Sequence, residues 1–469
     1  MYILVLESST TSAKAMLYDT QKGTYEVKTK AYTLHHNDVT IHKAEDIFAQ
    51  TVQLGKQLCE GKKIEIIALS GTWHSVMLCD KQMNPQTPVY LWSYTGAAQL
   101  CKELRKNSEY VKKFYQKTGC MVNAIYPAFK LKLLKQRYDL ADYLIVGQGT
   151  YNMYHLTGKR VVMNSMASGT GLLNIHTKQF DKEILQEIGI QEEQLPQLVT
   201  YKDTFALNKQ GAELLGLTEG IPVISTGPDG GLNQIGAGAL SDGVMTFSVG
   251  TSGAMRLTTQ KPILPENPST WCYLSPKSWL SGAATSGCCN CVDWFKSRMF
   301  TPSTSYSEIE KGFQKVDTPV FLPFLFGERC PGWQDERNAA FFDVKPYHIA
   351  NDLYHSVLEG VLFNLYQCYE VLSGLNGVPK KVKLSGGILH SDYWTQMCAD
   401  IFGVQMEVDN IEHSSLLGGV ALGLELLDLI PDVKDFTIEG SKVIIPNLEN
   451  REKYDKKYQR YQYWYHTTI

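Results

Sequence analysis

Three separate turns of this sequence gather hydroxyl and glycine residues where an apolar strand ends. They lie at residues 8–12, 250–253 and 385–387. A phosphate group needs several hydrogen-bond donors at close range; glycine lets backbone N–H groups approach it, and hydroxyls add further bonds. Neither a Walker A motif nor a GxGxxG motif follows a strand, which disfavours those two nucleotide-binding classes. Together the three turns favour a nucleotide site of another kind.

Asp229 is a candidate for acid–base chemistry. It follows an apolar strand and stands beside Gly227, Gly230 and Gly231. A carboxylate at such a strand end can accept the proton of a substrate hydroxyl. The alternative is an Asx-turn residue that bonds only to its own backbone, and the local pattern alone favours this alternative.

Trp73 and His74 follow another apolar strand, residues 64–70, and Gly71. The indole offers a face on which a polyol can stack, and the imidazole offers a hydrogen bond. Considered alone, such a pair is more often part of a hydrophobic core than of a binding site.

Two further features have tempting but disfavoured interpretations. Cys288, Cys289 and Cys291 lie close together, but no second CxxC pair or nearby histidine completes the four ligands of a zinc site, so buried thiols are favoured. Residues 454–465 mix aromatic and basic side chains that could stack on single-stranded nucleic acid. A closing helix that packs its tyrosines on the body of the protein is the favoured interpretation.

Apolar runs and helical spacing predict the elements that position these residues. We expect strands at 3–6, 13–18, 64–70, 221–225, 244–249 and 382–384, and helices at 44–58, 98–117, 128–137, 353–372 and 454–465. Gly374 and Pro379 are expected to end the helix at 353–372. The N-terminal strand–turn–strand is repeated after residue 244. This repeat predicts an α/β protein with two related domains, residues 1–238 and 239–469.

Length and charge limit the function classes. A chain of 469 residues is longer than the usual domain with a single hydrophobic core. Its 45 Lys and Arg residues against 48 Asp and Glu residues give a net charge of −3. We therefore expect no nucleic-acid partner and no acidic-membrane partner. No apolar run approaches 18 residues, and the start Met1-Tyr-Ile-Leu-Val-Leu6 lacks signal-peptide features. We expect a cytoplasmic protein; its oligomeric state stays open, a homodimer included.

The full set of motifs has a recognisable order. The chain carries, in sequence, Glu7-Ser-Ser-Thr-Thr-Ser-Ala-Lys14, Ser70-Gly-Thr-Trp-His-Ser75, Leu156-Thr-Gly158, Ser165-Met-Ala-Ser168, Gly227-Pro-Asp-Gly230, Phe247-Ser-Val-Gly-Thr-Ser-Gly253, Leu322-Pro-Phe-Leu-Phe-Gly-Glu-Arg329 and Ser385-Gly-Gly-Ile-Leu-His-Ser391. In kind and order these stretches resemble the motifs of the FGGY family of carbohydrate kinases, within the actin, hexokinase and Hsp70 superfamily. Each motif is modest alone, but the ordered set covers essentially the whole chain.

The resemblance implies two ribonuclease-H-like domains of the actin-like ATPase type that flank a catalytic cleft, with ATP and Mg²⁺ as cofactors. Asp229 becomes the general base and a further candidate for Mg²⁺, and Glu7 approaches Mg²⁺ through water. The remaining implied contacts are Thr10, Thr11, Ser12, Lys14, Gly250 and Thr251 with the phosphates, Gly387 and Ser391 with adenosine, and Trp73 and His74, beside Asp229, with the sugar.

The chain departs from the family pattern at several positions. Glu7 stands where the family has Asp, Ser9 where it has Gly, and Ile388 where it has a third Gly. We expect Glu7 and Ser9 to weaken ATP binding, because serine restricts φ where glycine does not, and we expect Ile388 to reshape the base pocket. After Trp92, where relatives often have an acidic residue and then Arg, the chain reads Ser93-Tyr-Thr-Gly96.

The favoured hypothesis is an ATP-dependent kinase of a small sugar or sugar acid, with gluconate preferred because residues 73–75 and 322–333 look closer to gluconate kinases. D-xylulose or another ketose is the alternative within this class. An alternative of another class is a catalytically weak relative that senses sugar or nucleotide. Glu7, Ser9 and Ile388 favour this sensor, whereas Asp229, Lys14 and residues 250–253 disfavour it.

Overall fold

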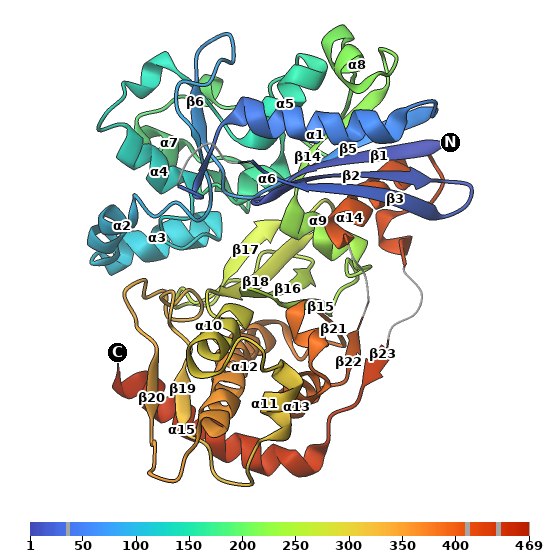
Figure 1. The fold of residues 1–469 in the computed structure, drawn as a ribbon. Helices are drawn as coiled ribbons and strands as arrows, with labels where there is room; N and C mark the ends of the chain where they lie inside the picture. The colour runs from blue at the N-terminus through green and yellow to red at the C-terminus, as the bar shows by residue number, and fades with distance from the viewer. Residues whose placement is uncertain (34–37, 409–412, 438–441, 469) are drawn as a thin grey trace.

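The computed structural model describes residues 1–33, 38–408, 413–437 and 442–468. Two β-sheets, one in each half of the chain, form its framework (Figure 1). The first sheet has the order β13-β14-β5-β1-β2-β3. Its strands are β1 (Tyr2–Ser8), β2 (Ser12–Asp19), β3 (Thr24–Ala31), β5 (Ile64–Gly71), β13 (Thr204–Ala206) and β14 (Pro222–Pro228).

The second sheet has the order β17-β18-β16-β15-β21-β22-β23. Its strands are β15 (Val244–Val249), β16 (Gly253–Thr259), β17 (Trp271–Leu274), β18 (Trp279–Thr285), β21 (Lys381–Ser385), β22 (Met406–Val408) and β23 (Lys442–Ile444).

The two sheets share one strand pattern. In the first, β1, β2 and β3 are antiparallel, and β5 and β14 then add parallel to β1. In the second, β15, β16 and β18 are antiparallel, and β21 and β22 add parallel to β15. This repeated pattern confirms the predicted fold of two ribonuclease-H-like, actin-like α/β units.

Fifteen α-helices and ten shorter strands accompany the two sheets in the part of the chain that the structure describes. The helices are α1 (Ala44–Cys59), α2 (Ala98–Arg105), α3 (Ser108–Thr118), α4 (Pro127–Leu134), α5 (Gln148–Thr157), α6 (Asn164–Ser168), α7 (Lys182–Ile188), α8 (Lys209–Leu215), α9 (Asp229–Gly236), α10 (Cys289–Met299), α11 (Tyr306–Lys311), α12 (Ala350–Asn376), α13 (Asp392–Phe402), α14 (Ser414–Leu426) and α15 (Arg451–Thr467). The shorter strands are β4 (Ile41–His42), β6 (Met77–Cys79), β7 (Val89–Tyr90), β8 (Leu144–Val146), β9 (Val161–Met163), β10 (Leu173–Asn174), β11 (Gln179–Phe180), β12 (Gln197–Val199), β19 (Val320–Leu322) and β20 (Ala340–Phe342).

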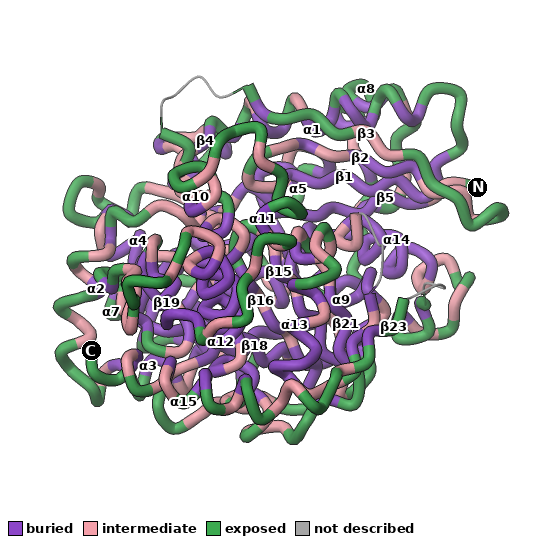
Figure 2. The backbone as a smooth tube through the Cα atoms, turned by 60° about the horizontal axis from the view of Figure 1, so that its bottom comes forward, coloured by how far each residue is buried: buried purple, intermediate pink, exposed green. Residues whose placement is uncertain are grey.

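Strand β1 is buried on both faces, which explains its unbroken apolar run (Figure 2). Leu4 and Leu6 pack with the residues of α1 in one hydrophobic cluster. Ile3 and Val5 point to the other face and belong to a second cluster, which contains α14 and continues into the second sheet. The hydrophobic core therefore joins the two halves of the protein.

Helices α9 and α14 cross in close contact between the sheets. A Cβ atom on Gly236 would lie 1.8 Å from the carbonyl oxygen of Ser414, and one on Gly418 would lie 2.0 Å from that of Leu232. Glycine is therefore required on both helices, because any side chain would collide with the opposing backbone.

Each of these helices also packs on the sheet of the other half. Gly419 of α14 lies against Val5 and Ala68 in the first sheet. Gln234 of α9 is hydrogen bonded to Thr246 and Thr258 in the second sheet. The division into residues 1–238 and 239–469 remains a prediction, and the packing shows that the two halves exchange one helix.

The structure refines several sequence predictions. The predicted helix 98–117 is two helices, because the side chain of Asn107 caps a new helix by accepting a hydrogen bond from Tyr110 N. The expectation that Gly374 ends the long helix is wrong: α12 continues to Asn376, and Gly377, at φ 77°, follows it. Gly374 sits inside the helix because glycine weakens a helix without blocking its hydrogen bonds.

The prediction for the C-terminal segment is confirmed, and of the three clustered cysteines Cys288 and Cys291 are buried while Cys289 is half-buried. Helix α15 buries Tyr454, Tyr458, Tyr461 and Tyr465, as expected of a closing helix. All eleven cysteines are free thiols. Within residues 1–33, 38–408, 413–437 and 442–468, no group of three His, Cys, Asp or Glu side chains is placed to hold a metal ion, and no helix has the length and hydrophobicity to span a membrane.

We predict that Gly418→Ala destabilises the protein by about 1–3 kcal/mol, because the new methyl group must push α14 away from α9. Urea unfolding followed by circular dichroism measures the change. The matched control is Gly374→Ala, whose Cβ would meet nothing within 4 Å. This control should gain about 0.5–1 kcal/mol. Equal stability of the two variants would contradict the close helix crossing.

Candidate active site

The first hydroxyl-rich turn joins β1 to β2 and is closed by serine. Ser9 N and Ser9 Oγ both donate to the carbonyl oxygen of Ser12, at 3.1 and 2.8 Å. Ser9 does not adopt a positive φ, so the expected conformational penalty for replacing glycine is absent. Thr10 and Thr11 form the tip, and Thr10 Oγ1 accepts a hydrogen bond from Trp92 Nε1 at 3.1 Å.

Glu7 and Lys14 face each other across this hairpin as register partners. Lys14 Nζ lies 2.7 Å from Glu7 Oε1, and Ser70 Oγ donates to Glu7 Oε2 at 2.8 Å. Glu7 is 1% exposed, so its charge is balanced locally by Lys14 rather than by solvent. This contact holds the ammonium group of Lys14 at the base of the turn.

The second and third turns lie side by side because β15 and β21 are parallel neighbours. Gly386 has φ 101°, and a Cβ there would lie 2.5 Å from Val249 O and 3.1 Å from Gly250 N. Only glycine fits this approach. Cys289 N, at the start of α10, donates to Gly250 O at 2.9 Å, and a Cβ on Gly387 would meet the Cys289 sulfur at 3.0 Å.

Ser391 and Ile388 differ from their expected roles in detail. The Ser391 hydroxyl accepts a hydrogen bond from Trp394 N at 3.0 Å, as the cap of α13, and donates to Glu310 Oε1 at 2.8 Å. Its bonds are therefore used within the protein. Ile388 is fully buried in the hydrophobic core, so its side chain packs inward rather than reshaping a base pocket as expected.

A cavity of about 280 Å³ joins the two halves of the protein at Asp229, and we call it the Asp229 cavity. It is lined by Thr10 of the first turn, Trp73 and His74, and Ser252 of the second turn. The structure thus brings together the predicted base, both sugar residues and two of the three turns. The other predicted site residues lie outside its lining: Glu7, Thr11, Ser12, Lys14, Gly250, Thr251, Gly387 and Ser391.

Asp229 is the first residue of α9, and its Oδ1 accepts a hydrogen bond from Gly230 N at 2.7 Å. Burial raises the pKa of Asp229 to about 6, the negative charge of Glu7 adds to this, and Gly230 N–H, Arg256 and Lys14 oppose it. The bond to Gly230 matches the local-backbone alternative, but the carboxylate also lines the cavity. Its pKa near 6 suits a general base at neutral pH.

His74 is held in a strained, left-handed conformation with φ 66°. Its Nδ1 contacts Gly169 O, which can only accept, so Nδ1 carries the proton. Burial lowers the pKa of His74 to about 3, and the ring is neutral, with Nε2 left as an acceptor. Lys130 Nζ donates to the His74 carbonyl at 2.9 Å and fixes this backbone.

Trp73 contributes its ring face rather than its N–H group. Trp73 Nε1 donates to Ser165 O at 3.1 Å, and the indole stacks on His74 at a ring separation of 5.9 Å. A further aromatic pair comes from β17, where Trp271 and Tyr273 stack at 4.4 Å. Tyr273 OH lies 2.8 Å from Tyr126 OH, so this wall of the cavity is tied to the other half of the protein.

Several cavity residues were not predicted from the sequence: Trp92, Arg256, Trp271, Tyr273 and Arg329. Trp271 and Tyr273 alternate along β17, the spacing of one strand face, but such aromatic residues are ordinary core residues in a sequence. Arg329 ends a stretch already singled out as a motif. No sequence signal marked Arg256, which lies on β16 beyond the second turn.

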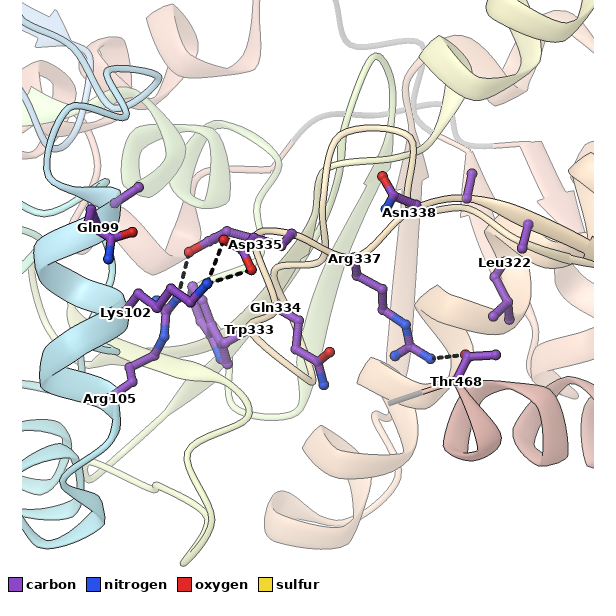
Figure 3. Close-up of a pocket in the computed structure, with 14 residues that line it drawn as sticks. Gln99, Lys102, Arg105, Leu322, Trp333, Gln334, Asp335, Arg337, Asn338 and Thr468 are labelled. Atoms are coloured by element: carbon purple, nitrogen blue, oxygen red, sulfur yellow. Dashed lines mark hydrogen bonds and ion pairs between the residues drawn. The ribbon is translucent and has the colours of Figure 1, made fainter.

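A larger cavity of about 570 Å³ lies between α2 and residues 333–340 (Figure 3). Lys102 Nζ pairs with Glu336 at 2.8 Å, and Arg105 with Asp335 at 2.9 Å. Arg337 on the same segment pairs with Glu328 at 2.9 Å. The Lys102–Glu336 and Arg105–Asp335 pairs join the two halves, whereas the Arg337–Glu328 pair lies within the second half. None of the three turns lines this cavity, which we therefore interpret as a contact between the halves.

Comparison with known proteins agrees with this geometry. Residues 2–236 match the N-terminal domain, and residues 245–425 the C-terminal domain, of the FGGY family of carbohydrate kinases. A gluconokinase of Bacillus subtilis (strain 168) is 28% identical over 451 residues, which cover 90% of this chain and 87% of that protein. A xylulose kinase of Lactococcus lactis subsp. lactis (strain IL1403) is 24% identical over 495 residues, covering 100% and 97%.

Solved structures give the same result. A gluconate kinase from Lactobacillus acidophilus superposes with a TM-score of 0.94 at 27% identity, covering 99% of this chain and 98% of that one. A ligand-bound xylulose kinase from the same species reaches 0.94 at 26% identity, with the same coverage. With both domains matched over most of the chain, this protein belongs to the FGGY family of carbohydrate kinases, which use ATP to phosphorylate sugars.

Proposed function

We propose that this kinase transfers the γ-phosphate of ATP to a hydroxyl group of a small sugar acid, with D-gluconate as the favoured substrate. The position of Asp229 carries the proposal: its carboxylate lines one cavity with Thr10 of the first turn and Ser252 of the second. The similarity to the gluconokinase of Bacillus subtilis and to the gluconate kinase of Lactobacillus acidophilus supports the choice of acid.

Asp229 is proposed as the general base. As the substrate oxygen attacks the γ-phosphorus, its proton passes to Asp229, the bond to the ADP oxygen breaks, and ADP leaves. The raised pKa of Asp229 strengthens it as a proton acceptor, while most of the group stays ionised at neutral pH.

We assign the binding of the ATP phosphates to residues of the first and second turns. Thr10, Thr11, Ser12 and Lys14 would bind them from the first half, and Gly250 and Thr251 from the second. Lys14 must exchange part of its contact with Glu7 for phosphate oxygens. Gly387 would lie beside adenosine. Ser391 would contact adenosine through its backbone, because its hydroxyl group is already hydrogen bonded to Glu310.

The carboxylates suit a hard cation. Asp229 and, through water, Glu7 offer oxygen atoms of the kind Mg²⁺ prefers, and the pKa of Asp229 is raised in part by the charge of Glu7. When bound, Mg²⁺ supplies charge neutralisation for the phosphoryl oxygens.

Trp73 and His74 are proposed to bind the sugar. The indole would cover the carbon chain, and His74 Nε2 would accept a hydrogen bond from a substrate hydroxyl. D-xylulose or another ketose is the second candidate substrate, favoured by the likeness to a ligand-bound xylulose kinase. The sensor hypothesis loses two of its supports, because Ser9 is unstrained and Ile388 packs in the core.

We predict that Asp229→Asn lowers kcat by about 10²–10⁴-fold, because the amide cannot accept the hydroxyl proton. ADP release measures turnover, and calorimetry should show ATP–Mg²⁺ binding within a few-fold of wild type. Asp242→Asn, the same change at an exposed position, serves as the control and should leave both values unchanged. Near-normal turnover of Asp229→Asn would disprove the assignment.

We predict that kcat/KM falls as pH drops through about 6, since protonation of Asp229 removes the base. Glu7→Gln removes the charge that raises the pKa of Asp229, so the acid limb should move to lower pH. Ser70→Ala removes one hydrogen bond to Glu7 but keeps its charge, and should leave the limb near its wild-type position. A limb that stays in place in Glu7→Gln would mean that another group titrates.

A further inference from the structure

Two arginine side chains reach the Asp229 cavity without a protein partner. Arg256 comes from β16, and Arg329 from the loop after β19. Within the part of the chain that the structure describes, neither guanidinium has a hydrogen bond or ion pair, and the Nε atom of each is buried and unsatisfied. Both residues are half-buried, and a guanidinium that is partly removed from water is stabilised by an anionic partner, because it has lost part of its hydration.

Arg337, which lies eight residues after Arg329, is an arginine whose terminal nitrogens are bonded within the protein, and it serves as a comparison. It pairs with Glu328 at 2.9 Å, donates to the Tyr465 carbonyl and Thr468, and is flanked by the rings of Phe324 and Tyr465. The Nε atom of Arg337 is also buried and unsatisfied, so the difference lies in the terminal nitrogens, for which Arg256 and Arg329 have no hydrogen bond or ion pair among the described residues. The guanidinium N–H groups of Arg256 and Arg329 are therefore available to bind a ligand that enters the cavity.

The charges of the cavity fit an anion. Two guanidinium groups face one carboxylate, Asp229, whose Oδ1 is already bonded to Gly230. His74 is neutral, and Glu7 is balanced by Lys14. An ionised Asp229 thus leaves one net positive charge. The segment after Trp92, Ser93-Tyr-Thr-Gly96, adds no acidic side chain that would repel an anion.

The direction of β16 separates Arg256 from the phosphate turn. Ser252, Ala254 and Arg256 all line the cavity. At a rise of about 3.3 Å per residue, the Cα of Arg256 lies about 13 Å beyond that of Ser252. A Cβ on Gly230 would meet both Arg256 Nη2 and the Trp73 ring at 3.0 Å, so the guanidinium lies at the sugar-binding side. Its place suits the sugar end of the cavity rather than the phosphates.

We propose that Arg256, assisted by Arg329, binds the carboxylate of the substrate and makes this kinase prefer a sugar acid to a neutral sugar. The proposal rests on the proposed function, whose base and phosphate turns it leaves unchanged. The planar guanidinium can donate two parallel hydrogen bonds to a carboxylate. Arg329 ends a motif that the wider family shares, so Arg256 is the residue that distinguishes the acid.

Steady-state kinetics with D-gluconate and with D-gluconamide tests the proposal, because the amide keeps the carbon chain and loses only the charge. Wild type should favour gluconate. Arg256→Gln should raise KM for gluconate about 10- to 100-fold and leave KM for gluconamide and for ATP within about threefold. Arg256→Lys should recover part of the loss. Arg298→Gln, at an exposed position, is the matched control and should match wild type.

The outcomes separate this proposal from the proposed function. If wild type phosphorylates ketoses but no sugar acid, the proposed function fails and the carboxylate site fails with it. If wild type phosphorylates gluconate and Arg256→Gln keeps the wild-type KM, only the assignment of Arg256 fails. Equal losses on both substrates with a raised KM for ATP would place Arg256 at the phosphates and overturn the proposal. Turnover of gluconamide by the variant shows that it is folded.

Discussion

The close crossing of α9 and α14 is the constraint on which the rest of the structure depends. Gly236 and Gly418 let each helix backbone touch the other, and each helix is anchored on the sheet of the opposite half. Asp229 is the first residue of α9, so the same crossing that joins the halves also places the proposed base. A helix of eight residues fixed at its end leaves its first residue little freedom. The two glycines that allow this crossing therefore both connect the two halves and fix the position of the proposed base.

The charged groups in and beside the cavity differ in how they are paired. Near the first turn, Glu7 and Lys14 neutralise each other, and the remaining influence of Glu7 raises the pKa of Asp229. Within the cavity, Arg256 and Arg329 have no hydrogen-bonded partners among the described residues, and Arg256 is close enough to Asp229 to oppose the rise in its pKa. A kinase needs one end that attracts and orients the acceptor and another that receives a proton and phosphate charge. A single cavity that holds both Asp229 and the two guanidinium groups can provide both.

The sequence predicted those parts of the fold and site that depend on local pattern. Apolar runs located β1, β2, β5 and β15, and the order of the turns identified the fold because each turn had its own residue signature. Arg256 could not be predicted, since one arginine on a strand looks like a solvent-facing residue until the neighbouring strands are known. The exchange of α9 and α14 was equally hidden, because helical spacing reports an apolar face but not the sheet it covers. The unstrained backbone of Ser9 and the burial of Ile388 could not be predicted either, because backbone φ and burial are properties of the folded chain.

The repeated five-strand pattern serves two different tasks, and the difference lies in the first hairpin of each sheet. In the first half, the hairpin is closed by the bond between Ser9 and Ser12. The ion-paired side chains of Glu7 and Lys14 lie in register on its two strands. In the second half the turn begins with Gly250, close to Gly386, and the strand that leaves it extends to Arg256. The first hairpin thus carries hydroxyl side chains at its tip, and the second combines glycine with the hydroxyls of Thr251 and Ser252, so the proposed phosphate site has candidate donors in both halves. Because the second hairpin continues along the cavity from Ser252 to Arg256, one element connects the turn proposed for the phosphates with the end proposed for the acceptor.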